Sequence, residues 1–147
     1  MAHPVDPEFD SAEKLFRSVS VDHISPSGDV LPTAVDVPRC SFNRERYAPN
    51  PLSVLVPSRP SENGVVALVA GDLPGPVPRP PKPPNVFEPL EFYLKDDPTD
   101  DNDAHAEVRV RPVGQAGSPN YKIKDKALRE KAKEALARKL RIVVNPT

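Results

Sequence analysis

The chain is poor in the residues that cross-link, anchor or fill many proteins. Among its 147 residues are one cysteine, one methionine, six glycines, eight aromatic side chains and no tryptophan. The lone Cys40 excludes an intramolecular disulfide framework and fits a reducing compartment. No apolar run approaches the roughly 18 residues of a membrane-spanning helix, and residues 1–9 lack the basic and apolar stretches of a secretory leader. We therefore expect a cytoplasmic protein with no membrane partner.

Apolar residues and net charge are also scarce. The hydrophobic content is 37%, whereas soluble domains typically have about 45–50%, so the core should be small and built mainly from valine, leucine and alanine. The formal net charge of −1 gives the whole chain no electrostatic preference for nucleic acid or membrane. The length is that of one domain, which we expect to span residues 1–147.

The charges are unevenly distributed along the chain. Residues 88–121 carry a net charge of −5, whereas residues 122–147 carry a net charge of +6. The simplest interpretation places the basic segment against the acidic one, in the same chain or in a partner.

Proline is abundant, and seven of the eleven residues from 74 to 84 are proline. Each proline fixes φ and removes a backbone donor, so this run joins neither a helix nor a central strand. We expect residues 74–84 to form an exposed, extended spacer within the domain.

Two segments predict helices. Asp10 and Glu13 fit a capping box, and Leu15, Phe16 and Val19 would share one face of a short N-terminal helix. Residues 124–140 predict a longer C-terminal helix, with a narrow apolar stripe made of Leu128, Ala132, Ala135, Leu136 and Leu140.

Other segments predict strands. Small and branched apolar residues alternate with charged ones over residues 105–113, which is typical of a half-buried strand. The continuous apolar run at 65–70 predicts a strand buried on both faces. Shorter strands are expected at 30–37, 40–42, 52–56, 86–94 and 142–144. The predicted class is α+β, with a small mixed or antiparallel sheet, the two helices and the exposed proline-rich arm.

Catalytic and metal-binding patterns are weak. Cys40 with His23 or His105 would make a thiolate–imidazole pair. A small enzyme or toxin with a site near Cys40, Arg44, Arg46 and His105 is therefore one alternative. The three histidines do not have zinc-ligand spacing. A calcium loop starting at Asp101 would need glycine and glutamate where the chain has alanine and proline. We therefore expect no metal and no cofactor.

Basic residues are the candidates for partner binding. Lys131, Lys133 and Lys139 lie on the predicted C-terminal helix, and Arg79 and Lys82 lie within the proline-rich arm. The helix would alternatively neutralise phosphates as a nucleic-acid-binding module, although it lacks interleaved aromatic residues.

Several segments together resemble a loose family of small uncharacterised bacterial proteins with no established activity. They are LFRSVSVDHISPSGDVLPTAV at 15–35, CSFNRERY at 40–47, NGVVALVAGDL at 63–73 and DNDAHAEVRV at 101–110, followed by the lysine- and alanine-rich helix. The chain departs from the family pattern at residues 32–34. The resemblance implies a single bacterial cytosolic module, and Asp101, Asp103 and His105 are the polar positions that match best.

The small core and exposed arm favour a non-enzymatic accessory subunit that binds another protein of the same bacterial operon or system. A defence or toxin-linked operon is one setting for such a subunit. A strand-entry histidine that satisfies backbone groups is the structural alternative for His105.

Overall fold

The protein is described here by a computed structural model, which covers residues 3–55, 63–78, 89–118 and 120–146. Its strands form one six-stranded sheet in the order β4-β5-β2-β1-β3-β6, with antiparallel pairing throughout. The strands are β1 Lys14–Ser20, β2 Arg39–Arg44, β3 Asn63–Val69, β4 Leu90–Asp96, β5 His105–Pro112 and β6 Arg141–Val144. One α-helix, α1 Lys126–Lys139, and four 3-10 helices, η1 Val21–His23, η2 Pro32–Ala34, η3 Pro51–Val54 and η4 Ala70–Asp72, complete the described elements.

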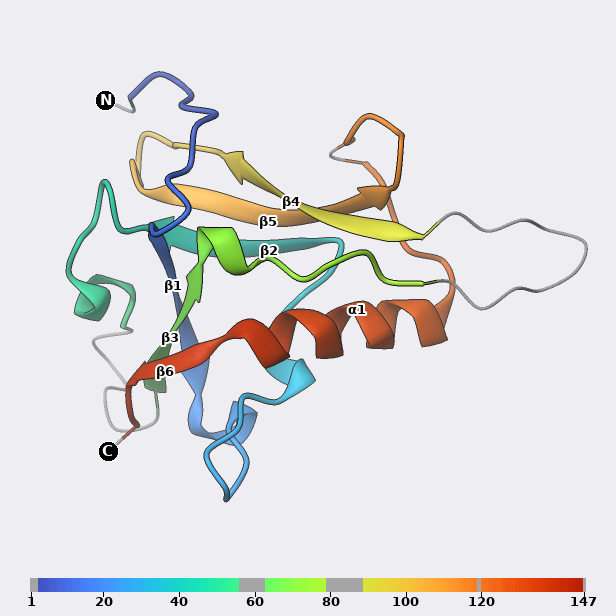
Figure 1. Ribbon diagram of the computed structural model, residues 1–147. Helices are drawn as coiled ribbons and strands as arrows, with labels where there is room; N and C mark the ends of the chain where they lie inside the picture. The colour runs from blue at the N-terminus through green and yellow to red at the C-terminus, as the bar shows by residue number, and fades with distance from the viewer. Residues whose placement is uncertain (1–2, 56–62, 79–88, 119, 147) are drawn as a thin grey trace, which may run out of the picture.

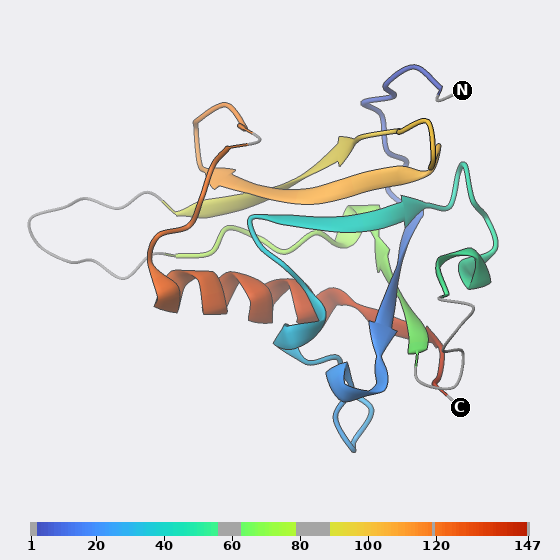
Figure 2. The same ribbon diagram turned by 180° about the vertical axis from the view of Figure 1, so that it is seen from behind.

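The sheet divides into two halves that run in different directions (Figures 1 and 2). One half contains β4, β5 and β2, and the other contains β1, β3 and β6. The halves are joined where β1 meets β2, at the pairs Leu15–Arg44 and Phe16–Asn43. Beyond these pairs the two strands separate.

Helix α1 covers one face of both halves (Figure 1). Asp125 caps its first turn by accepting a hydrogen bond from the Leu128 amide at 3.1 Å. The predicted stripe is confirmed in large part, because Leu128, Ala132 and Leu136 are at most 1% exposed and join the main core. A smaller apolar cluster, made of Phe16, Val65 and Ala67 with Val54, Leu55 and Val144 beside them, lies on the opposite face near η3.

The predicted short N-terminal helix is wrong, since β1 occupies those residues. Leu15 and Val19 enter the core beneath α1, whereas Phe16 enters the smaller cluster on the other face. Asp10 does cap the segment, but its oxygens accept from the Ala12 and Glu13 amides in a turn that leads directly into the strand. Pairing on both sides, with β2 and β3, outweighs the local helical signal.

The strand predictions have mixed outcomes. The doubly buried strand is confirmed as β3 and the alternating strand as β5. The segments 40–42, 86–94 and 142–144 contribute to β2, β4 and β6, although residues 86–88 lie outside the described part. No continuous strand forms at 30–37: Val30 makes a single bridge with Ile24, and Pro32 begins the 3-10 helix η2. Residues 52–54 of the predicted strand at 52–56 lie in η3, which Pro51 begins, and residue 56 lies outside the described part.

The proline-rich arm is partly attached to the sheet. Val77 is 5% exposed and exchanges backbone hydrogen bonds with Leu90, at 2.7 and 3.0 Å. The expected exposed spacer is therefore wrong at Val77, which makes a bridge to β4, whereas Gly75, Pro76 and Pro78 are exposed. Residues 79–84 of the arm, including Arg79 and Lys82, lie outside the described residues.

Candidate active site

The candidate site lies on the face of the sheet opposite α1, where β1 and β2 separate. β1 pairs with β3 along its whole length, and β2 pairs with β5. Side chains near this divergence line a groove of about 360 Å3. Phe16 and Val54 contribute apolar surface, and Ser41, Asn43 and His105 contribute polar groups. The groove therefore suits a small molecule with both apolar and polar parts.

Arg17 of β1 reaches across the divergence. Its Nη1 donates to the backbone oxygen of Ser41 at 3.0 Å and its Nε to that of Ala34 at 2.9 Å. Nη2 lies 3.3 Å from the carboxylate of Asp36, which is 76% exposed. A guanidinium has five N–H groups, so two remain without a partner among the described residues. Arg17 is thus a fixed positive charge with donors available to an anion.

His105 connects a hydroxyl to a carboxylate. Its Nδ1 lies 2.9 Å from the backbone oxygen of Asp97 and 3.1 Å from that residue's Oδ2. Both oxygens only accept hydrogen bonds, so these partners assign a proton to Nδ1. Nε2, 3.1 Å from Ser41 Oγ, is then the acceptor for the serine hydroxyl in the neutral ring. This is the arrangement of a nucleophile, a general base and an orienting group.

A second carboxylate lies beside the histidine. Glu107 is paired across the strands with Ser41, and ligand atoms of Asp97, His105 and Glu107 all lie within 4.8 Å of one another. These donor types suit zinc. However, Arg109 binds Glu107 Oε1 through Nε and Nη2 at 2.8 and 2.7 Å. A metal would have to displace that contact and the Asp97–His105 contact.

The Glu107–Arg109 pair is electrostatically strong. Burial works to lower the pKa of Arg109, but the hydrogen bond and charge of Glu107 outweigh it and raise that pKa. Arg109 is therefore charged, and Glu107 has a permanent counter-ion beside the groove.

Of the predicted enzyme residues, only His105 lies at this groove. Cys40 is 1% exposed and faces the α1 side of the sheet. Arg44 is fully buried at the end of β2 and is engaged by acidic residues. Arg46 is exposed and pairs with Asp6 at 3.0 Å. The structure therefore does not assemble the predicted site near Cys40, because Cys40 and Arg44 face the opposite side of β2 from Asn43, the residue that pairs with His105.

The predicted polar site is brought together only in part. Asp101 and Asp103 are exposed in the loop between β4 and β5, and neither lines the groove. Asn102, between them, does line it and donates to Asn43 Oδ1 at 2.8 Å. His105 follows at the start of β5 and, as the structural alternative anticipated, also satisfies a backbone oxygen.

The predicted partner-binding lysines lie on a different surface. Lys131 and Lys139 are exposed and line a groove of about 370 Å3 between α1 and residues 74–78, whereas the half-buried Lys133 does not line it. The acidic loop 97–104 lies well apart from α1 in both views (Figures 1 and 2). The expected position of the basic helix near the acidic loop of its own chain is therefore wrong.

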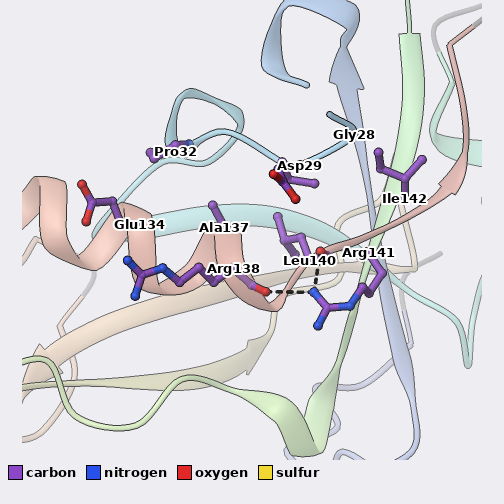
Figure 3. Close-up of a pocket in the computed structure, with 10 residues that line it drawn as sticks. Gly28, Asp29, Pro32, Glu134, Ala137, Arg138, Leu140, Arg141 and Ile142 are labelled. Carbon is purple, nitrogen blue, oxygen red and sulfur yellow. Dashed lines mark hydrogen bonds between the residues drawn. The ribbon is translucent and has the colours of Figure 1, made fainter. Parts of the chain in front are cut away.

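A cavity of about 700 Å3 lies between the turn at Gly28 and the C-terminal end of α1 (Figure 3). Arg141 in its wall binds the backbone oxygens of Arg138 and Leu140, at 2.9 and 3.1 Å. Its other charged side chains, including Asp29 and Glu134, are exposed. It contains no aligned nucleophile and base, so size alone does not make it the better candidate.

Sequence reasoning missed Arg17, Ser41 and Asp97. The alternation of strand faces would have separated Ser41 from Cys40. The register that pairs residues 41 and 43 of β2 with 107 and 105 of β5 has no local signal in the sequence. The turn that brings Asp97 close to His105 also has no local sequence signal beyond its aspartates and Pro98.

No helix among the described residues is long and apolar enough to cross a membrane. Comparisons with protein-family models, curated proteins and solved structures find no match to this chain.

Proposed function

We propose that the protein is a small hydrolase or transferase that acts on an anionic ester in the groove between β1 and β2. The observation that carries this proposal is the geometry of His105, whose Nδ1 faces Asp97 while Nε2 faces Ser41 Oγ at 3.1 Å. A neutral histidine held in this tautomer is ready to accept the serine proton.

The reaction follows from the order of the groups. Ser41 Oγ attacks the electrophilic centre as its proton passes to Nε2 of His105. Asp97 stabilises the imidazolium that forms. His105 then gives this proton to the oxygen of the leaving group. The rest of the substrate stays bound to Ser41 as an ester. Water, or an acceptor hydroxyl deprotonated by His105, cleaves that ester and restores the serine hydroxyl.

Arg17 supports an anionic substrate. Arg17 lines the same groove as Ser41, and its exposed pair with Asp36 is weak enough to be replaced by a ligand. A phosphate or carboxylate would accept two charge-assisted hydrogen bonds from the guanidinium.

The test is covalent labelling by a fluorophosphonate, in which the Ser41 oxygen displaces fluoride from phosphorus, with the modified residue identified by peptide mass spectrometry. We expect Ser41→Ala to abolish labelling. His105→Gln should slow it by about 10²–10⁴-fold, the usual contribution of a general base. Ser53→Ala is the matched control, because Ser53 lines the same groove but contacts no imidazole in the described structure.

Equal labelling of Ser41→Ala and the unmodified protein would refute the proposal. So would labelling that is unaffected by His105→Gln.

We propose a second candidate function, a cytoplasmic accessory subunit that binds another protein of the same bacterial system. The observation that favours it is the groove between α1 and residues 74–78, whose wall includes Lys131 and Lys139. A partner with an acidic extended segment would complement this surface. The single buried cysteine supports a reducing compartment.

Co-purification at native expression level tests this second function. Replacing Lys131, Lys133 and Lys139 with glutamine should remove the partner, whereas the same change at Lys122, Lys124 and Lys126 should retain it. If the first triple variant instead loses affinity for DNA or RNA, with a salt slope about two to three units smaller, nucleic-acid binding replaces the protein partner. Retention of every partner by both variants would contradict this function.

A further inference from the structure

An N-terminal strap, residues 3–13, lies across the ends of β2 and β4 before the chain enters β1 (Figure 1). The His3 ring stacks on Tyr47 with centroids 3.8 Å apart, and its Nε2 bonds the backbone oxygen of Asp103 at 2.7 Å. The Phe9 ring covers the guanidinium of Arg44 at 3.8 Å. The strap thus contacts β2 and the loop that follows β4.

Arg44, the last residue of β2, is the centre of these contacts. It is 0% exposed, and four of its five N–H groups donate hydrogen bonds to described residues. Nε and Nη2 bind the Glu13 carboxylate at 3.0 and 2.8 Å, and Nη2 also donates to the backbone oxygen of Glu8 at 2.8 Å. Nη1 donates to the backbone oxygen of Asp6 at 3.1 Å and lies 3.2 Å from Asp96 Oδ1.

Asp96, at the end of β4, depends on this arginine. Its side chain is fully buried, and its Oδ2 accepts from the Asp6 amide at 2.6 Å. Its Oδ1 has no aligned hydrogen bond in the described structure, so the ion pair with Arg44 neutralises it. Burial works to lower the pKa of Arg44, but Glu13 and Asp96 outweigh it and raise that pKa. Removing the guanidinium would leave the buried Asp96 carboxylate without this counter-ion, whereas Arg44 is also paired with Glu13.

The same arginine holds both residues that adjoin the candidate histidine–carboxylate pair. Its side chain binds Asp96, the neighbour of Asp97. Its backbone N–H donates to the oxygen of Ala104, the neighbour of His105, at 2.7 Å. The Asp97 amide donates to the backbone oxygen of His105 at 3.0 Å, so the end of β4 and the start of β5 are also bonded directly to each other.

We propose that Arg44 is a positioning residue for the candidate active site. The N-terminal strap contributes to this role because it covers Arg44 and shields it from water. The inference rests on the proposed role of His105 as a base. Arg44 touches neither Ser41 nor the groove; it fixes the ends of β4 and β5 so that Asp97 meets Nδ1 and Nε2 remains free to accept.

The test measures the protonation of the His105 ring by nitrogen-15 NMR, which distinguishes a protonated nitrogen from an acceptor and does not require activity. In the unmodified protein we expect Nδ1 to be protonated and Nε2 to be the acceptor. Asp96→Asn replaces one acceptor oxygen by an NH2 donor, which would face the donors of Arg44 or of the Asp6 amide. The end of β4 should then move and carry Asp97 away from His105, so the two ring nitrogens should lose this distinct pattern. Asp101→Asn, in the exposed part of the same loop, is the matched control and should keep it.

A second variant covers the case in which Asp96→Asn does not fold. Deleting residues 2–8 exposes both Arg44 and Asp96 to water. Water can then solvate both charges, so neither stays buried without the other. We expect this variant to show the same loss of pattern, together with at least tenfold slower labelling of Ser41. A folded variant of either kind that keeps the ring pattern of the unmodified protein overturns the proposal.

Hydrogen exchange in the unmodified protein gives an independent result. The amides of Asp6 and Asp97 should exchange at similar rates, because one opening event releases both. A difference above tenfold, after correction for intrinsic rates, would show that the strap and the site open separately. If fluorophosphonate never labels Ser41 but the ring pattern changes as expected, the positioning role holds and only the proposed chemistry fails.

Discussion

At the scale of single residues, two neighbours in β2 have opposite chemistry. Ser41 is exposed at the groove, whereas Cys40 is buried in the core. Burial, the largest effect, raises the pKa of the Cys40 thiol and disfavours its reactive thiolate. We expect Cys40→Ser to keep Ser41 labelling unchanged at a stability cost of about 1–3 kcal/mol. Urea unfolding and mass spectrometry measure the two quantities.

The native thiol should react with a disulfide reagent only as the protein unfolds. Rapid reaction under native conditions, or loss of Ser41 labelling in folded Cys40→Ser, would contradict an inert cysteine.

Residue-scale prediction from the sequence succeeded where one strand contained the whole signal. The alternation along residues 105–113 predicts the buried positions Ala106, Val108 and Val110 of β5. Ser41 and Arg17 had no such signal, since their roles arise from contacts between different strands. Nothing local distinguishes Ser41 from the other serines of the chain.

At the scale of elements, α1 depends on packing for its order. A 14-residue helix is marginal in water, and Leu136, at 0% exposure, lies in the middle of its contact with the sheet. Leu136→Asp buries an unpaired charge, so we expect a loss of more than about 4 kcal/mol, in the range of the most severe substitutions. Circular dichroism and urea unfolding measure the helix content and the loss.

Lys131→Asp is the matched control for Leu136→Asp, because Lys131 is exposed on the same helix. Its effect should lie within about 0.5 kcal/mol. Similar stability of the two variants would show that α1 does not contribute its apolar stripe to the core.

A helix or strand could be predicted from the sequence when its apolar side chains all pack in the way that a single pattern implies. Helix α1 has one stripe and β3 a continuous apolar run, and both predictions hold. In β1, by contrast, adjacent apolar residues serve two cores on opposite faces. The spacing of Leu15, Phe16 and Val19 then resembles one face of a helix, and only pairing with β2 and β3 decides against it.

At the scale of the whole molecule, the attachment of the N-terminal strap should depend on pH. The hydrogen bond from the Glu8 amide, followed by that from the Tyr47 hydroxyl, holds the pKa of Asp6 below its ordinary value of 3.8. This contribution to stability is therefore complete above the ordinary pKa and is lost as the pH falls through the lower folded value. We expect the strap to detach only as the pH falls below this ordinary value. Amide exchange across residues 3–13 measures the detachment.

Asp6→Asn removes this titration while leaving the backbone contacts of residue 6 in place. Its strap should be less protected at neutral pH and should change less as the pH falls below the ordinary pKa of an aspartate, 3.8. Identical acid profiles for the variant and the unmodified protein would assign the acid response to another carboxylate.

The position of β3 between β1 and β6 has a consequence for the order of synthesis. β1 and β3 are both made early, but β6 begins 72 residues after β3 ends. At about 5–20 residues per second, the ribosome needs roughly 4–14 seconds to make that stretch. During this interval one edge of β3, rich in branched apolar residues, has no strand beside it. A nascent chain stalled between the two strands is thus the form of this protein most in need of a chaperone.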